Sequence, residues 1–288
     1  MLKEPSNNRY LEVKDFSVSG EWFQLKQNSQ FGFLETTPQP SLDKLSDYYI
    51  SDDYISHTDA KRNLFEKMYH AVRRVALKQK LHLINKYATS SKQLLDIGCG
   101  TGEFLKVAQE NKWYVSGLEP NSQARQIANN KTNGKVLDVT DAASLKANSF
   151  DVITLWHVLE HVPNLEQQIH TIKTLLKFDG TLIIAVPNHN SFDANYYKSF
   201  WAAFDVPRHL WHFNKAAISK LFSHAGFQLV NVKPMYFDAF YVSLLSEKYK
   251  TGKMNFLKGI YIGILSNLKS LRSKECSSLI YILKRSEN

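Results

Sequence analysis

Hydrophobic and polar residues change their spacing several times along the middle of the chain. Short apolar runs, typical of buried strands, alternate with stretches in which apolar residues return every three or four positions, as in amphipathic helices. Strands are predicted at 93–97, 114–118, 135–139, 150–155 and 181–186, and helices between them at 103–111, 122–130 and 165–177. This alternation is typical of parallel βαβ units, which place helices on both faces of one sheet.

The segments on either side of this region follow other patterns. Aromatic and aliphatic residues between 22 and 33 predict a short hairpin that ends before Pro38 and Pro40. The other expected elements are a helix at 59–87, an irregular aromatic-rich stretch at 188–213, a helix at 215–225, a strand at 227–237, helical structure over 238–275 and a strand at 277–284.

Together these elements predict an α/β protein with a doubly wound, Rossmann-like, mostly parallel seven-stranded sheet, an N-terminal cap and a helical insertion. We expect an aromatic cap and helix over 1–90, a core over 91–237 and a basic helical insertion with the final core strand over 238–288. The aromatic stretch at 188–213 is expected to act as a lid over a substrate, to pack as a cluster of its own, or both.

Composition is that of an ordinary globular protein, with 43% hydrophobic and 22% charged residues among 288. No apolar run is long enough to cross a bilayer, and the N-terminus lacks the apolar region of a secretory signal. The two cysteines, Cys99 and Cys276, cannot form a disulfide framework. These features predict a soluble protein of the reducing cytoplasm.

The net charge of +9 is concentrated near the C-terminus. Residues 248–285 contain nine Lys or Arg and one acid, so they carry +8 of the total. A nucleic-acid-binding protein would spread its basic residues more widely, and we therefore expect no nucleic-acid partner. Residues 254–272 combine apolar and basic positions at helical spacing. Such a helix can lie on an anionic membrane, but more often it packs on its own domain or at a homodimer interface.

A glycine-rich turn carries the strongest functional signal. The first core strand runs into Gly98, Gly100 and Gly102 and then into a helix. Glycine lets the backbone turn tightly and approach a ligand without a Cβ in the way, and the helix N-terminus offers free N–H groups. A plain tight turn is the alternative for such a pattern.

Neighbouring residues indicate which ligand this turn would take. Glu103 stands where the dinucleotide fingerprint G-x-G-x-x-G needs glycine or alanine. The carboxylate of Asp96 would disfavour a pyrophosphate and suit a cation. Glu119, at the end of the second core strand, is placed to accept two ribose hydroxyls. The predicted ligand is a nucleoside that carries a positive charge.

These motifs resemble the class I S-adenosylmethionine-dependent methyltransferases, in the UbiG-like branch (methyltransferase types 11, 12 and 23). The resemblance spans about 91–237. Its motifs are DIGCGTG at 96–102, GLEP at 117–120, DV at 138–139, SFDVI at 149–153, WHVLEHV at 156–162, LLKFDGTL at 175–182, RHLWHF at 208–213 and AGF at 225–227.

The resemblance implies S-adenosyl-L-methionine as cofactor and S-adenosyl-L-homocysteine as product. In relatives, a segment at the position of Tyr48, Tyr49, Tyr54 and His57 folds over the cofactor. The cofactor-binding residues it implies are Tyr54, Asp96, Gly98, Cys99, Gly100, Glu119, Pro120, Asp138, Val139, Trp156 and His157.

Three histidines are candidates for taking a proton from the acceptor: His157, His161 and His209, with Asp205 as an orienting partner. A packing role is the alternative, above all for His161. The H-x-x-E-H spacing also matches a zinc protease, but it directly follows a βαβ strand and precedes Pro163. Some relatives bind Mg²⁺ through E-x-x-E-H here. Histidine replaces the first acid, so we expect no metal.

The N-terminal hairpin resembles half of a zinc ribbon found in many relatives. Gln27 and Gln30 stand where those relatives have cysteine ligands, so no structural zinc is expected. Trp22, Phe23 and Phe33 are expected to hold the hairpin instead.

The predicted reaction is methyl transfer to a small or lipid-linked acceptor, with oxygen favoured. A sugar-type carbon acceptor is an alternative, because the altered ribbon also resembles sugar C-methyltransferases. A nucleic-acid methyltransferase is disfavoured, since no N-P-P-Y follows the fourth strand and no cysteine lies in a Pro-Cys motif. A nicotinamide-dependent oxidoreductase and a non-catalytic cofactor-binding protein are the remaining alternatives.

Overall fold

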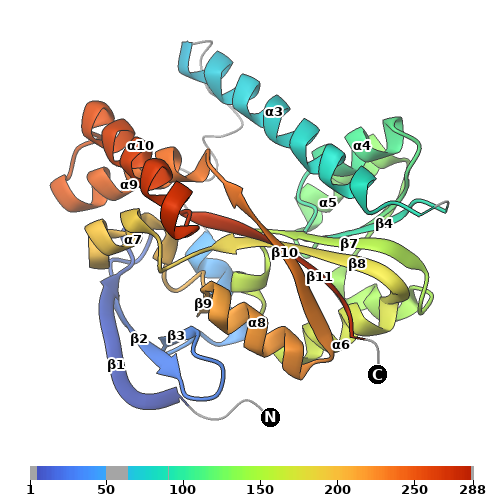
Figure 1. Ribbon diagram of the computed structural model, residues 1–288, viewed down its shortest axis with the longest axis horizontal. Coiled ribbons are helices and arrows are strands. Elements are labelled where there is room, and N and C mark those ends of the chain that lie inside the picture. Colours follow the sequence, from blue (N-terminus) through green and yellow to red (C-terminus); the bar gives the residue numbers. More distant parts are fainter. Residues whose placement is uncertain (1–4, 50–63, 90, 287–288) are drawn as a thin grey trace.

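A seven-stranded sheet runs through the molecule (Figure 1) in the order β10-β11-β8-β7-β4-β5-β6. The structure is a computed structural model that describes residues 5–49, 64–89 and 91–286. Only β11 runs against its neighbours, so the sheet is mostly parallel, as predicted. The strands are β4 (Gln93–Ile97), β5 (Tyr114–Leu118), β6 (Val136–Leu137), β7 (Phe150–Trp156), β8 (Leu176–Pro187), β10 (Phe227–Met235) and β11 (Ser278–Arg285).

Helices cover both faces of this sheet (Figure 1). Successive residues of a strand point to opposite faces, so Leu94 packs with α3, α4 and α5 while Leu95 packs with α6 and α8. Asparagine side chains cap the N-termini of α5, α6 and α8 by accepting a backbone N–H. The helices are α3 (Leu64–Lys86), α4 (Glu103–Glu110), α5 (Ser122–Thr132), α6 (Leu165–Leu175) and α8 (Lys215–His224).

Most predicted elements are found, with differences at their ends. The strand predicted at 135–139 is reduced to Val136–Leu137, because Asp138 caps a 3₁₀ helix, η3 (Val139–Ser144). The helical stretch predicted over 238–275 is two helices, α9 (Asp238–Thr251) and α10 (Phe256–Ser273). Gly252, at φ +74°, ends the first of them.

The N-terminal hairpin is confirmed as β2 (Trp22–Asn28) and β3 (Leu34–Thr37), which pair antiparallel. The structure adds β1 (Pro5–Lys14) on one side and β9 (Trp211–His212) on the other. Phe23 and Phe33 are buried as expected, but Trp22 is 59% exposed, so the prediction that it holds the hairpin is wrong. The Asn28 side chain holds the turn by accepting the N–H groups of Gln30 and Phe31. Two short helical turns follow, α1 (Leu42–Leu45) and η1 (Ser46–Tyr49).

The aromatic stretch after β8 is largely interior. Tyr197, Trp201 and Phe204 are buried in a cluster that also includes residues of β1, β2, α9 and α10. The clustering alternative is therefore confirmed, and closure over a substrate stays a prediction. The division of the chain into three parts also stays a prediction, because β9 joins this stretch to the N-terminal sheet. Its helical turns are α7 (Phe192–Tyr197), η5 (Lys198–Phe200) and η6 (Ala202–Phe204).

α9 and α10 lie side by side beyond one edge of the sheet, at the upper left of Figure 1. The buried carboxylate of Asp193 in α7 connects α10 to the end of the sheet, because it accepts hydrogen bonds from Ser266 of α10 and from Ser277 beside β11. Within the described ranges, no helix is long and apolar enough to pass through a membrane.

Candidate active site

The candidate site lies at the carboxyl edge of the sheet. Parallel strands β4, β5 and β7 end there, so the residues that follow each strand come together although they are far apart in the sequence. Asp96 lies in β4, Glu119 follows β5 and Trp156 ends β7. In open α/β sheets this edge is where ligands bind.

The three glycines of the turn have positive φ, at +68°, +54° and +76°, but they differ in their surroundings. A Cβ on Gly98 would collide with Val158, and a Cβ on Gly102 would lie 2.9 Å from the Cα of Ala128. These two glycines are required by packing. A Cβ on Gly100 would meet nothing within 4 Å, so this backbone is open to a ligand.

Glu119 connects β5 to the glycine turn. Its carboxylate accepts the N–H of Gly100 at 2.8 Å and that of Asn121 at 3.0 Å, and the residue is 7% exposed. Arg125 donates to the carbonyl of Glu119 at 2.6 Å and pairs with Asp138 at 2.9 Å. Arg125 therefore contacts both acidic residues that were predicted at the ends of β5 and β6, Glu119 and Asp138.

Asp96 is a buried carboxylate beside the turn. It is 3% exposed and accepts a hydrogen bond from the hydroxyl of Thr154 at 2.6 Å. Burial raises its pKa to about 7, although Thr154 and the charge of Lys80 oppose the shift. The ammonium of Lys80, from α3, lies 4.5 Å from the centre of the Trp156 ring. A second cation that bound here would hold Asp96 ionised.

His157 is fixed as a charged group. Its φ is +57°, and its two ring nitrogens lie 3.3 Å from Glu160 and 3.0 Å from Asp238. Burial alone would lower its pKa, but the hydrogen bonds and charges of Asp238 and Glu160 raise it to about 10. An imidazolium at neutral pH has no lone pair to offer, so this geometry suits positioning rather than proton removal.

His161 and His209 face each other, with ring centres 4.5 Å apart. The Nδ1 of His161 lies 3.0 Å from the carbonyl of Arg208, and that of His209 lies 2.9 Å from the carbonyl of Ala203. A carbonyl can only accept a hydrogen bond, so Nδ1 carries a proton in both rings.

Glu160 completes this cluster from η4 (Leu159–His161). It is 1% exposed, and its Oε2 has no hydrogen-bond partner among the described residues. One ligand atom from each of Glu160, His161 and His209 lies within 4.8 Å of the others. A carboxylate with two imidazoles has the ligand chemistry of a zinc or iron site, and it equally suits transfer of a proton to a histidine.

Several other predicted residues are placed less centrally. Burial and the charges of Asp96 and Glu119 raise the pKa of the Cys99 thiol, so it is inert. The carbonyl of Pro120 accepts from Arg125, and Val139 is 39% exposed on η3. Tyr54 and His57 lie outside the described residues.

Two charged residues of the site were missed by sequence reasoning. Asp238 follows the end of β10 after two residues, and β10 ends at the same edge as β8, so its place after a strand was a usable signal. Lys80 lies within a long helix, where nothing in the pattern distinguishes it from a solvated lysine.

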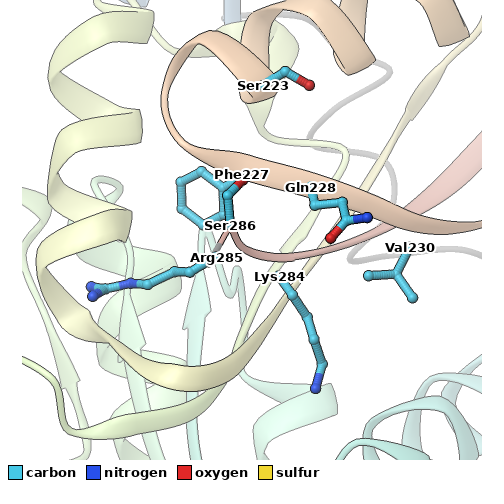
Figure 2. A pocket seen from close by; sticks show the side chains of 7 residues that line it. All are labelled: Ser223, Phe227, Gln228, Val230, Lys284, Arg285 and Ser286. Carbon is cyan, nitrogen blue, oxygen red and sulfur yellow. The ribbon is translucent and has the colours of Figure 1, made fainter. Parts of the chain in front are cut away.

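A hollow elsewhere on the molecule is unrelated to this site (Figure 2). Lys284 pairs with Thr181, so the hollow lies at the amino edge of β8, opposite the glycine turn. Its lining residues are Ser223, Phe227, Gln228, Val230, Lys284, Arg285 and Ser286.

The strand order, the glycine turn and the acidic strand ends define a class I, Rossmann-like S-adenosylmethionine-dependent methyltransferase. The chain belongs to the methyltransferase-domain family, whose model matches residues 68–232.

Relatives and solved structures agree with this class. A ubiquinone biosynthesis O-methyltransferase of Coxiella burnetii is 29% identical over 125 residues, which cover 38% of this chain and 53% of the relative. An uncharacterized protein of Methanocaldococcus jannaschii is 38% identical over 109 residues, which cover 37% of this chain and 41% of the relative. The chain thus spans about half the length of the curated relatives it matches.

Among solved structures, the magnesium protoporphyrin IX methyltransferase of Synechocystis matches this chain with a TM-score of 0.54 and 17% identity. The match covers 85% of this chain and 100% of the Synechocystis protein. A SAM-dependent methyltransferase from Archaeoglobus fulgidus matches with a TM-score of 0.50 and 17% identity, over 77% of this chain and 100% of the Archaeoglobus protein. At these identities the likeness shows the fold.

Proposed function

We propose that this protein transfers a methyl group from S-adenosylmethionine to an oxygen atom of a small or lipid-linked acceptor. The observation that carries the proposal is the open backbone at Gly100 between the buried carboxylates of Asp96 and Glu119. The name of the Coxiella relative supports oxygen as the accepting atom. A carbon acceptor is the alternative.

The residues at this edge fit the cofactor. The carboxylate of Asp96 would attract its cationic part, Glu119 would accept its ribose hydroxyls, and Gly100 admits its close approach. The indole N–H of Trp156 is buried, with no partner among the described residues, and is a further donor. The cofactor supplies an activated methyl group, so the protein has mainly to position the acceptor and exclude water. Asp138 and Val139 are proposed to contact the base.

A pair of glycine variants tests the open backbone. We expect Gly100→Ala to weaken S-adenosylmethionine binding at least about tenfold, because a Cβ would occupy the space that a ligand enters. Gly134→Ala is the matched control. Gly134 also has positive φ, at +74°, and a Cβ there would also meet nothing within 4 Å. Both variants should lose about 1 kcal/mol of stability through the same backbone strain.

Isothermal titration calorimetry measures the affinities of the two variants, and urea unfolding measures their stabilities. Equal cofactor affinity in Gly100→Ala and Gly134→Ala would contradict the assignment of the turn.

A test of the function itself does not require the acceptor to be identified first. The protein is incubated with cell extract and methyl-labelled S-adenosylmethionine, and the products are analysed by mass spectrometry, with Asp96→Ala as the blank. We expect a labelled small molecule or lipid in which the label is attached to oxygen. A label on carbon would select the alternative, and no label above the blank would reject the enzymatic role.

A further inference from the structure

Six large apolar side chains of α10 point away from the protein. The helix was expected to pack on its own domain or at a homodimer interface, and in the single chain these six side chains are 42–86% exposed. At about 100° of rotation per residue, they fall within an arc about 100° wide along the helix. They are Leu257, Ile260, Tyr261, Ile264, Leu268 and Leu271, and we call them the α10 stripe.

The opposite face of α10 attaches the helix to the protein through small residues and the buried Ile262. Gly259, Gly263, Ser266 and Ser270 are buried there. A Cβ on Gly259 would lie 3.0 Å from the Cα of Leu244 in α9, and one on Gly263 would lie 3.1 Å from that of Phe240. The two helices therefore pack by close backbone approach. The fold does not need the α10 stripe, which leaves that stripe for another contact.

The surroundings of the α10 stripe are positively charged. Residues 248–274 contain seven Lys or Arg and no Asp or Glu. Lys253, Arg272 and Lys274 are exposed, and Lys269 lies over the ring of Phe192 at 4.0 Å. Lys258 pairs with the buried Glu247 at 3.8 Å, so the stripe is bordered mainly by cations. Such a stripe is complementary to a surface that offers anions and hydrocarbon together.

We propose that α10 docks the protein on an anionic bilayer surface, with the α10 stripe in the boundary between headgroups and acyl chains and the basic residues on lipid phosphates. A second copy of the chain is a poorer occupant. In a two-fold contact the same patch meets itself, so its basic residues would face the same basic residues of the second copy.

The docking helix is connected to the candidate site. Asp238, the first residue of α9, lies 3.0 Å from the ring of His157. The helix pair that would rest on lipid therefore begins at the site's own imidazolium. Resting on the proposed function, this arrangement favours the lipid-linked acceptor class over a freely diffusing one.

Vesicle binding tests the docking without cofactor or acceptor, so its outcome is separate from that of the methyltransferase assay. The full chain is sedimented with vesicles of phosphatidylcholine alone, or with about 30% phosphatidylglycerol to supply anionic charge. We expect at least about tenfold stronger binding to the anionic vesicles, weakened at about 0.5 M salt by screening.

A double substitution in the stripe, Leu257→Ser with Leu268→Ser, should reduce this binding at least about tenfold by removing two inserted side chains. Tyr114→Ser with Phe178→Ser is the matched control, since these residues are similarly exposed, at 69% and 64%, but lie on the sheet. Circular dichroism checks that both variants fold.

Binding by the control and its loss in the stripe variant would support the proposal. Absence of anionic vesicle binding, or equal binding by both variants, would overturn it. A wild-type dimer in sedimentation that the stripe variant converts to monomer, without vesicle binding, would assign the stripe to a second copy and also overturn it.

Discussion

Replacing His209 by alanine is expected to lower the rate of methyl transfer about 10²- to 10⁴-fold, the usual contribution of a general base, while S-adenosylmethionine affinity stays unchanged. The Nδ1 proton of His209 is donated to the carbonyl of Ala203, which leaves Nε2, near Glu160 and Asp205, as the atom that could accept a proton. These carboxylates would stabilise the imidazolium that forms when Nε2 accepts the acceptor's proton.

The other two histidines are less suited to this role. His157 is already protonated at neutral pH, because its raised pKa is about 10. Burial lowers the pKa of His161 to about 4, which leaves a weak base. We propose that His161 and His157 position the acceptor and His209 accepts its proton.

The rate of labelled product formation at saturating cofactor, measured for the wild type and for His209→Ala, checks this assignment. The substitution should lower this rate without changing the affinity for the cofactor. His189→Ala is the control, since His189 is as buried, at 7% against 8%, and bonds to Asn214 instead. A rate abolished by a chelator and restored by a divalent ion would replace the base with a metal at Glu160, His161 and His209.

Arg208→Met is expected to destabilise the fold by about 3–5 kcal/mol, the range for breaking a buried ion pair from one side. The Arg208 guanidinium is 7% exposed and donates to Asp205 at 2.7 Å, to Asp15 at 3.1 Å and to the carbonyl of Tyr48 at 2.9 Å. Methionine would fill the volume, but it would leave the buried carboxylate of Asp15 without its cation.

Urea unfolding of Arg208→Met and of a surface control measures this effect. Arg73→Met is the control, because Arg73 and Glu103 form an exposed pair at 3.7 Å, which should contribute less than about 1 kcal/mol. A loss in Arg208→Met no larger than in the control would show that the aromatic stretch and the N-terminal sheet do not depend on this arginine.

Local pattern was sufficient to predict the elements of the core. The bounds predicted for β4 and β5 are those observed, because each strand is a short apolar run flanked by polar turns. The break between α9 and α10 could also have been predicted, because Gly252 is a residue that ends helices and Asn255 is one that caps the start of the next. The prediction for Trp22 was wrong, because aromatic character does not say which face of a strand is buried.

The sequence was sufficient to predict that Asp96 and Glu119 lie at the same edge of the sheet, because the carboxyl ends of parallel strands meet there. It could not predict the charge of His157. That charge depends on Asp238, which is distant in the sequence and reaches the ring only through the packing of β10 and α9. Nor could it show that α10 is attached by its small face, since the stripe alone does not say which side meets the protein.

The central claim is that a positively charged nucleoside binds between Asp96 and Glu119. It is tested most directly by titration calorimetry of S-adenosylmethionine into the wild type and Asp96→Asn, at pH 8 and at pH 6. Asparagine keeps the shape and the hydrogen bond from Thr154 but removes the charge.

We expect one site in the wild type, about 10- to 100-fold weaker binding by Asp96→Asn, and wild-type affinity that falls from pH 8 to pH 6. The fall follows because the free carboxyl, with its pKa raised to about 7, becomes protonated as the pH drops, and a bound cation needs it ionised. Equal affinity in both proteins, or no binding by the wild type while it binds a nicotinamide dinucleotide, would contradict it.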